Sequence, residues 1–469
     1  MFLLLGVVSL LPYAYLLQFE SLREHTVEFE YAFFAAFGLY VLATIRVLHQ
    51  QQTSRWTLAW IFLVAALLEG TQLMMRPTLS DDMYRYVWDG RIQWQGISPY
   101  AYPPSATELA KFRDRQIWTS INRKDAVTVY PPAAEALYAL LWRIWPDNVR
   151  GFQFAMGLGG LAAGWLVVRL LLALNCNPAW VLIYLWSPLL IFETAHSAHV
   201  DGLVLLFLVG AWLARLRERD TLVGILLGIA TALKVYPAVL LPALWRPRHP
   251  QGRYRMPLAF LATVVVCYLP YMAASGTGVI GFLPKYFQEQ FNIAPFVRLL
   301  LFTINKIGAD PKTGLLLLTL AVLLVIGLWM VRYPAKDGET AIRRSVWLMG
   351  ALALLSQDLF PWYLLWFLPL LAVFLRPITL NIPFGRRLMG IPFLRMDGWA
   401  GLWLFCGLAG LSYTFFIRWR PVSLAIWAQF LPVYLLLFID LLHFAHLKLA
   451  AREIHANQPK DRIGVQKPS

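Results

Sequence analysis

The sequence predicts an all-α polytopic integral membrane protein with about 12–14 transmembrane helices. The composition carries this prediction, because 59% of the 469 residues are hydrophobic and only 14% are charged, whereas soluble domains are roughly half apolar and a quarter charged. The 20 tryptophans and 20 tyrosines suit interfacial belts, where amphipathic rings meet lipid headgroups. We therefore expect the bilayer to be the solvent of this protein, and no separate soluble domain.

Apolar runs near the length that crosses a bilayer, roughly twenty residues, recur along the whole chain. We expect spans at 2–17, 31–48, 57–75, 151–173, 179–194, 202–214, 221–233, 236–246, 257–272, 313–331, 345–357, 362–375, 398–416 and 423–443. Several are short, and broken helices or snorkelling side chains would let them cross. The first run has no basic segment before it, so we expect a retained span and not a signal peptide.

The formal net charge of +15 comes mostly from basic residues in short segments between apolar runs. This distribution is typical of topology signals and lipid contacts, so a nucleic-acid partner is not expected. By the positive-inside rule, cytoplasmic turns are marked by Arg46, Arg55, Arg215, Arg217, Arg219, Arg246, Arg248, Arg253, Arg255, Lys336, Arg343, Arg344, Arg386, Arg387 and Arg395. Both termini are then expected inside.

This topology holds only if the segments 131–146 and 291–305 do not cross, so both are predicted to be surface helices. The long polar segment 76–150 then faces outward. The other outward elements are the turn 196–202, the turn at Lys234, the loop 273–312 and the turn 356–363. We expect these elements to converge on one side of the membrane.

The first outward segment begins with an acidic helix. Asp81 can cap a helix that runs to about Gln95, and Asp82, Arg85 and Asp89 fall at i, i+3 and i+7 on one face of it. A carboxylate pair at the mouth of a span is a good place for a general base. The alternative is that the acids only cap the helix and interact with its dipole.

A second polar cluster follows in FETAHSAHVDG, where Glu193, His196, His199 and Asp201 crowd the outer end of a span. Ionisable residues at such a depth are costly and are functional candidates by default. A hydrated turn is the alternative. Histidines at i, i+3 without a fixed third ligand are a weak metal signal, so we expect a histidine-lined polar site and no metal ligands.

Lys234 lies alone between two short apolar halves, where a cation suits a lipid phosphate. The alternative is that it snorkels to the headgroups. Near the end of the apolar module, Asp358 precedes Trp362 and Tyr363, which could stack on a sugar ring or belong to the interfacial belt. The belt is the interpretation that we expect for Trp366.

The chain resembles GT-C superfamily glycosyltransferases in an ordered set of motifs. These are SDDMYRYVWDGRIQWQGISPYAYPP, VYPP, SPLLIFETAHSAHVDGL, LKVYPAVLLP and FPWYLLWFLP. The likeness is greatest to bacterial mannosyltransferase-like members and to the GPI mannosyltransferase that adds the first mannose, and it covers most of residues 57–375. Two apolar spans precede the acidic loop, whereas in the family the loop usually follows the first span.

The resemblance implies a polyprenyl-phosphate sugar donor, a lipid or glycan acceptor, and an inverting displacement on the extracytoplasmic face of a bacterial plasma membrane. It implies that Asp81 or Asp82 is the general base, and that Lys234, Arg85 and Arg91 hold the departing phosphate. The implied substrate pocket contains Asp89, Tyr130, Glu193, His196, His199, Asp201, Tyr236, Asp358, Trp362 and Tyr363. No cofactor is required for this chemistry, and assistance by a divalent metal is an alternative.

The resemblance also divides the chain. Residues 1–56 are expected to be an added pair of helices, 57–375 the catalytic membrane module with its loop 76–150, and 376–469 further spans with a short basic cytoplasmic tail. The rival function is a transporter or flippase of lipid-linked glycans, which would predict inverted repeats. The sequence shows no such repeats, so a glycosyltransferase is the favoured function.

Overall fold

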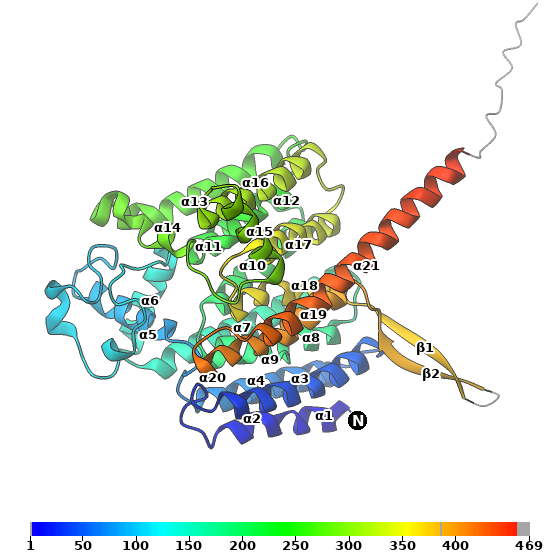
Figure 1. The fold of residues 1–469 in the computed structure, drawn as a ribbon, viewed down its shortest axis with the longest axis horizontal. Coiled ribbons are helices and arrows are strands. Elements are labelled where there is room, and N and C mark those ends of the chain that lie inside the picture. Colours follow the sequence, from blue (N-terminus) through cyan, green and yellow to red (C-terminus); the bar gives the residue numbers. More distant parts are fainter. Residues whose placement is uncertain (1, 385–386, 457–469) are drawn as a thin grey trace, which may run out of the picture.

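In the computed structural model, which describes residues 2–384 and 387–456, the chain is a bundle of α-helices (Figure 1). Within the described residues, seven helical segments are long and apolar enough to cross a membrane, and a bent pair would be an eighth. The seven are α3 (Thr26–Leu48), α4 (Arg55–Leu73), α7 (Val149–Ala173), Gly252–Tyr286, α16 (Pro311–Arg332), Gly398–Arg418 and Ser423–His443. The prediction of an all-α polytopic membrane protein is confirmed.

The remaining predicted spans are shorter or interrupted helices, which is why fewer full-length helices are found than apolar runs. The bent pair joins Pro178–Leu185 to Pro188–His196 at 57°. The shorter elements are α1 (Phe2–Val8), α2 (Leu10–Leu16), η3 (Pro178–Val181), α8 (Leu182–Leu185), α9 (Pro188–Ile191), η4 (Phe192–His196), α10 (Asp201–Leu216), α11 (Asp220–Leu233), η5 (Tyr236–Leu240), α12 (Leu241–Leu244), α17 (Gly338–Leu355), η7 (Pro361–Phe367) and α18 (Leu368–Phe374). Prolines near the starts of η3, α9, η5, α12, η7 and α18 explain the breaks, because proline cannot donate the backbone hydrogen bond that continues a helix.

The C-terminal half of the chain contains further helices of the bundle. They are α13 (Gly252–Ser275), η6 (Gly276–Ile280), α14 (Leu283–Tyr286), α15 (Pro295–Lys306), α19 (Gly398–Gly407), η8 (Leu408–Thr414), α20 (Phe415–Arg418) and α21 (Ser423–Ala456). Two of them enter the region around the candidate site, because α14 lies in the loop 273–312 and η8 contacts the buried end of η4 through Tyr413 and Glu193.

The two predicted surface helices are present. α6 (Pro132–Ile144) and α15 are 13 and 12 residues long, too short to cross a bilayer that needs about twenty. α6 packs tightly on α5 (Asp82–Gln93), since a Cβ on Gly90 would lie 2.5 Å from the carbonyl oxygen of Tyr138. The loop between them contains the short helices η1 (Thr107–Phe112) and η2 (Trp118–Ser120).

A β-hairpin departs from the all-α prediction. β1 (Pro377–Phe384) pairs antiparallel with β2 (Arg387–Leu394), in a register that places Pro377 opposite Leu394. No strand was predicted here, because both strands contain proline, which normally argues against a paired strand. The predicted basic turn at Arg386 and the tail after residue 456 lie outside the described residues.

The bundle has two distinct ends. Figure 1 shows α5, α6 and α14 at one end, and the hairpin with the far part of α21 at the other. The predicted basic turns gather at the hairpin end, where His49 Nε2 lies 2.9 Å from the carbonyl oxygen of Ile378 and Arg248 Nη2 donates to that of Arg332 at 2.9 Å. The polar segment 76–150 and the basic turns therefore occupy opposite ends, as the predicted topology requires.

Candidate active site

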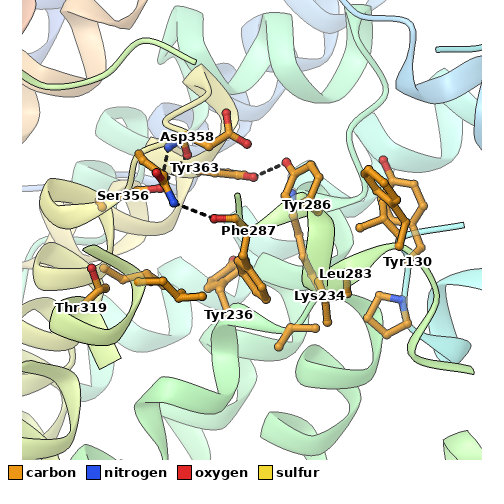
Figure 2. Close-up of a pocket in the computed structure, with 18 of the residues that line it drawn as sticks. Tyr130, Lys234, Tyr236, Leu283, Tyr286, Phe287, Thr319, Ser356, Asp358 and Tyr363 are labelled. Atoms are coloured by element: carbon orange, nitrogen blue, oxygen red, sulfur yellow. Dashed lines mark hydrogen bonds between the residues drawn. The ribbon is translucent and has the colours of Figure 1, made fainter. Parts of the chain in front are cut away.

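A cavity of about 440 Å³ opens at the α5 end of the bundle. One part of its wall is polar and the other is formed by aliphatic and aromatic side chains (Figure 2). The polar part includes Asp82, Asn122, Arg123, Tyr130, Lys234 and Asp358. The apolar part includes Val235, Val239, Phe282, Leu283, Phe287, Leu315, Leu316, Leu320, Leu323, Leu352 and Leu355. The shape suits a ligand with a polar head and an apolar tail.

The structure separates the two adjacent acids at the start of α5. Asp81 pairs with Arg23, whose Nη2 lies 2.8 Å from Oδ1, and its side chain is 35% exposed. Asp82 faces the cavity, where its carboxylate accepts hydrogen bonds from Asn122 Nδ2 at 2.6 Å and from the Tyr130 hydroxyl at 3.1 Å. Asp82 is therefore the acid that a molecule bound in the cavity meets.

The surroundings of Asp82 keep it ionised. Burial alone would raise the pKa of this carboxyl group, but the positive field of His199, Arg123 and Lys234 and the hydrogen bond from Asn122 outweigh burial and lower the pKa below that of a free aspartate. A carboxylate that is charged at neutral pH and partly removed from water can accept a proton from a hydroxyl group held beside it.

His199 lies between two acids. Its Nε2 is 3.3 Å from Oε2 of Glu193, and its Nδ1 is 3.9 Å from Oδ2 of Asp82. The other carboxylate oxygen of Glu193 accepts a hydrogen bond from the hydroxyl group of Tyr413. The predicted cluster at the end of the broken span is thus real, and it connects to the cavity through His199 and Asp82.

Lys234 is held at the cavity by a buried acid. Its Nζ lies 2.6 Å from Oδ2 of Asp201, whose Oδ1 accepts a hydrogen bond from Trp366 Nε1 at 3.2 Å. Tyr236 stacks on Trp366 with a centroid separation of 3.6 Å, and Nζ lies 5.2 Å from the centroid of the Tyr363 ring. Trp366 is therefore a buried partner of the lysine's counter-ion, and its predicted place in the interfacial belt is wrong.

Arg85 reaches the cavity from a buried network. Its Nε lies 2.8 Å from both carboxylate oxygens of Asp89, and Nη1 donates to the carbonyl oxygen of Ala126 at 2.9 Å. Below it, Glu135 accepts a hydrogen bond from Thr128 at 2.6 Å. Asp89 is thus the counter-ion of Arg85, and both residues fix the loop that carries Asn122 and Arg123.

Seven predicted site residues do not line the cavity, namely Asp81, Asp89, Arg91, Glu193, His196, His199 and Asp201. Two of them, Arg91 and His196, have structural partners. Arg91 donates to Asp147 at 2.8 Å and pairs with Asp114, so its guanidinium group ties the segment 112–147 to α5. His196 is fully buried, and its Nε2 accepts a hydrogen bond from the backbone N–H of Thr78 at 3.2 Å. Each of these two side chains therefore has a structural partner within the fold and does not line the cavity.

The aromatic residues of the turn 356–367 form stacked columns. Trp362 stacks with His199 at 3.8 Å and with Phe360 at 4.4 Å, and Phe360 stacks in turn with Phe291 at 4.5 Å. The two ring faces of Trp362 are thus occupied within the protein, so the predicted stacking of this ring on a sugar is not available. The column instead holds His199 in place, while Tyr363 lines the cavity itself.

Residues 281–292, the cover segment, line part of the cavity through Phe282, Leu283, Tyr286 and Phe287 and are bonded to segments on two sides of it. On one side, the backbone N–H of Phe282 donates to the carbonyl oxygen of Thr128 at 2.9 Å. On the other side, the backbone N–H of Phe291 donates to the carbonyl oxygen of Gln357 at 3.2 Å. Figure 2 shows the Tyr286 hydroxyl pointing toward that of Tyr363. The cover segment therefore joins the acidic loop to the turn 356–363.

The sequence missed several residues of the site, namely Asn122, Arg123, Tyr286, Glu289 and Tyr413. Arg123 lines the cavity, and its Nε donates to Glu289 at 2.9 Å. These residues lie in loops or far along the chain and follow no periodic pattern. Within the described residues, no group of three or more His, Cys, Asp or Glu side chains is arranged to hold a metal ion.

Comparisons with known proteins identify the family of the chain. The family model described as alpha-(1->6)-mannopyranosyltransferase, N-terminal domain, matches residues 8–246. The chain is 26% identical over 356 residues to alpha-(1->6)-mannopyranosyltransferase A of Mycobacterium tuberculosis, covering 66% of this chain and 67% of that protein. It is 26% identical over 185 residues to alpha-(1->6)-mannopyranosyltransferase A of Corynebacterium glutamicum, covering 37% of this chain and 36% of that protein.

A eukaryotic relative matches as well. The chain is 30% identical over 147 residues to GPI mannosyltransferase 1 of Aspergillus fumigatus, covering 29% of this chain and 33% of that protein. The resemblance to GT-C mannosyltransferases is thereby confirmed. The family match includes Asp82, His199 and Lys234 and extends over just over half of the 469 residues. The chain therefore belongs to the alpha-(1->6)-mannopyranosyltransferase family and is a membrane-embedded glycosyltransferase.

Proposed function

We propose that the protein transfers a hexose, by analogy with its relatives a mannose, from a polyprenyl-phosphate donor to a hydroxyl group of a lipid or glycan acceptor. The observation that carries the proposal is the pairing of an ionised Asp82 with the cations Lys234 and Arg123 on the polar wall of one cavity. A glycosyl transfer needs both, because a proton must leave the attacking hydroxyl while negative charge grows on the departing phosphate.

A lipid donor is supported by the rest of the cavity wall. α16 is strongly apolar and most of its residues are not buried within the protein, so it lies at the edge of the bundle. Leu320 on this helix lines the cavity and is 53% exposed. We infer that the apolar end of the cavity opens sideways past α16, where an isoprenoid tail would pass from the lipid into the site.

The proposed reaction is a single inverting displacement. The acceptor hydroxyl group loses its proton to the Asp82 carboxylate and its oxygen attacks the anomeric carbon of the donor. The bond from that carbon to the phosphate oxygen breaks, and the electron pair leaves with the polyprenyl phosphate. Lys234 and Arg123 stabilise the charge that develops on the phosphate. No resident cofactor is needed for this step.

The extracytoplasmic face is supported by charge. The cavity lies at the end of the bundle opposite the turns that carry Arg46, Arg248 and Arg343, and such basic turns are usually cytoplasmic. The cavity then faces outward, where polyprenyl-phosphate sugars serve as donors for enzymes that cannot reach nucleotide sugars.

The test compares Asp82→Asn with Asp81→Asn in proteoliposomes, following release of polyprenyl phosphate from a panel of polyprenyl-phosphate hexoses with membrane extract as acceptor. We expect the Asp82 variant to lower kcat by about 10²–10⁴-fold, the usual worth of a general base. Asp81→Asn breaks only a half-exposed ion pair, costs at most about 1 kcal/mol of stability, and keeps its activity.

A measurement of donor binding distinguishes a variant that has lost the chemical step from one that no longer binds the donor. Binding is measured as equilibrium binding of a radiolabelled donor to each variant, and it should persist in Asp82→Asn. An equal loss of kcat in both variants would contradict the role of Asp82 as the general base. If the wild type turned over no donor at all, the transfer reaction itself would be refuted.

A further inference from the structure

Asp358 occupies a rigid position on the cavity wall. It lies in the turn between α17 and η7, where its backbone N–H donates to Ser356 Oγ at 3.1 Å and its carbonyl oxygen accepts from the same hydroxyl group at 2.7 Å. The next residue, Leu359, donates its backbone N–H to the carbonyl oxygen of Phe291 at 3.0 Å. The turn is thus fixed from both sides, and the side chain is placed in advance of any ligand.

The carboxyl group of Asp358 makes no hydrogen bond to the described residues of the fold. The residue is only 5% exposed, and among the described residues neither carboxylate oxygen has a hydrogen-bond partner. Nearby buried acids are all engaged: Asp89 with Arg85, Asp201 with Lys234, and Glu193 with Tyr413. A buried polar group without a partner is costly unless a ligand supplies the partner.

The chemistry of this group matches a sugar hydroxyl. Burial, together with the charges of Glu289 and Asp82, raises the pKa of Asp358 to about 8, with Arg123 acting in the opposite direction. At neutral pH the carboxyl group is therefore mostly protonated and offers one donor and further acceptor capacity. A hydroxyl group likewise donates and accepts. A neutral acid also adds no second negative charge to a cavity that must accept an anionic phosphate.

The aromatic ring of Trp362 offers no free face to a sugar, so polar atoms must recognise the sugar there. The faces of the Trp362 ring are taken by His199 and Phe360, so a sugar cannot stack there. Tyr286 and Tyr363 direct their hydroxyl groups toward each other beside Asp358 (Figure 2). Among the described residues that line the cavity, Arg85 Nη2, the Tyr236 hydroxyl group and both carboxylate oxygens of Asp358 are buried without a hydrogen-bond partner, and Asp358 is the carboxyl group of this set.

We propose that Asp358 determines sugar specificity, and that its carboxyl group binds a pair of hydroxyl groups of a hexose. This rests on the proposed transfer reaction, in which two hexoses can supply the hydroxyl pair: the sugar carried by the donor, or the sugar that accepts it. Asp358 is a binding residue in this proposal, and Asp82 retains the proton transfer.

The test uses the full-length protein in proteoliposomes and compares the wild type with Asp358→Leu and Asp358→Asn. Each is given the polyprenyl-phosphate mannose donor and its monodeoxy analogues at the 2-, 3-, 4- and 6-positions. A parallel series keeps the mannose donor and varies deoxy analogues of a mannoside acceptor. We expect the wild type to reject the analogue that lacks the bound hydroxyl group by about 100-fold or more in kcat/KM.

Asp358→Leu should lose this discrimination to within about threefold, while Asp358→Asn keeps part of it because an amide still donates and accepts. If discrimination is lost in the donor series, the hydroxyl pair belongs to the donor sugar, and if it is lost in the acceptor series, the pair belongs to the acceptor sugar. Glu30→Gln is the matched control, since Glu30 also has a buried oxygen without a partner among the described residues but lies on α3 outside the cavity wall. Discrimination unchanged in Asp358→Leu, or activity lost equally for every analogue, would overturn the proposal.

If the wild type turns over no donor, the transfer reaction is refuted but the hydroxyl contact of Asp358 is not. A second measurement then tests this contact. Binding of methyl mannoside and its deoxy analogues to purified protein is followed by saturation-transfer NMR. A preference for the full sugar that disappears in Asp358→Leu supports the hydroxyl contact, and an identical preference in both proteins refutes it.

Discussion

Asp81 and Asp82 are adjacent in the sequence and have different partners in the fold. The sequence predicted an acidic pair but left the choice between them open, because a helix start places consecutive side chains about 100° apart and the partners lie far along the chain. Arg23 pairs with Asp81, and Asn122 donates a hydrogen bond to Asp82, so the two acids point to different places. Such contacts depend on tertiary structure, which local pattern does not encode.

The pKa of Asp82 has a kinetic consequence. A general base works only when deprotonated, so activity should fall as the pH drops through the pKa of Asp82, which lies below that of a free aspartate because His199, Arg123 and Lys234 and the bond from Asn122 outweigh burial. We expect kcat/KM to be constant from pH 7 down to about pH 5 and to fall only below about pH 4.

Initial rates in proteoliposomes over this range, corrected for any loss of folded protein, measure the effect. An Asn122→Ala variant should shift the acid limb upward, since it removes one bond to the charged form. An acid limb near pH 6 in the wild type would contradict the assignment of Asp82 as the ionised base.

At the scale of elements, the cover segment depends on interactions that no single element could predict. Gly281 has φ +59°, and a Cβ there would lie 2.1 Å from the carbonyl oxygen of Thr128, so only glycine allows this close approach. The sequence predicted that 273–312 faces the site side, and the structure shows that it contacts the acidic loop. It did not predict which residues make the contact, because glycine is also common in loops without close packing.

The ion pair between Arg123 and Glu289 should hold the cover segment closed. Arg123→Glu and Glu289→Arg each place like charges together, so hydrogen exchange of residues 281–292 should become about fivefold faster or more, equivalent to roughly 1 kcal/mol. The double variant Arg123→Glu with Glu289→Arg restores the pair and should restore protection.

Transfer activity should stay low in the double variant, because a carboxylate then faces the departing phosphate where a cation stood. Arg343→Glu, which breaks the exposed pair with Glu339 at the other end of the bundle, serves as the control and should leave exchange of the cover segment unchanged. Protection that is unaffected by either single variant would show that the backbone bonds alone hold the segment.

At the scale of the whole molecule, composition predicted the fold class and the convergence of distant segments. The 59% hydrophobic content and the basic turns were enough, because bilayer thickness and charge asymmetry constrain every span at once. The hairpin β1–β2 was not predicted, and neither were the 3₁₀ helices η5 and η7 that follow the predicted turns at Lys234 and 356–363. Hydropathy reports an apolar run but not whether its backbone is continuous.

The sideways opening past α16 yields a test of the lipid donor. Leu320→Trp should narrow the opening and raise KM at least about tenfold for a donor with a long polyprenyl chain, while a donor with a two-isoprene chain is affected less. Leu324→Trp is the matched control, because Leu324 lies one turn further along α16, is 61% exposed, and does not line the cavity.

The two variants are compared by initial rates with both donors at equal protein incorporation. Equal effects of the two tryptophans, or an effect of Leu320→Trp that is independent of chain length, would place the entry of the lipid elsewhere.

If the donor enters past α16 as proposed, this route sets the dimension in which the donor is encountered. A molecule that reaches its site from within the bilayer never samples the bulk aqueous volume, so its effective concentration is a mole fraction in the membrane plane. Collisions then occur by lateral diffusion in two dimensions. Turnover in the cell is governed by how crowded the leaflet is with other lipids, and the protein competes for its substrate by surface density.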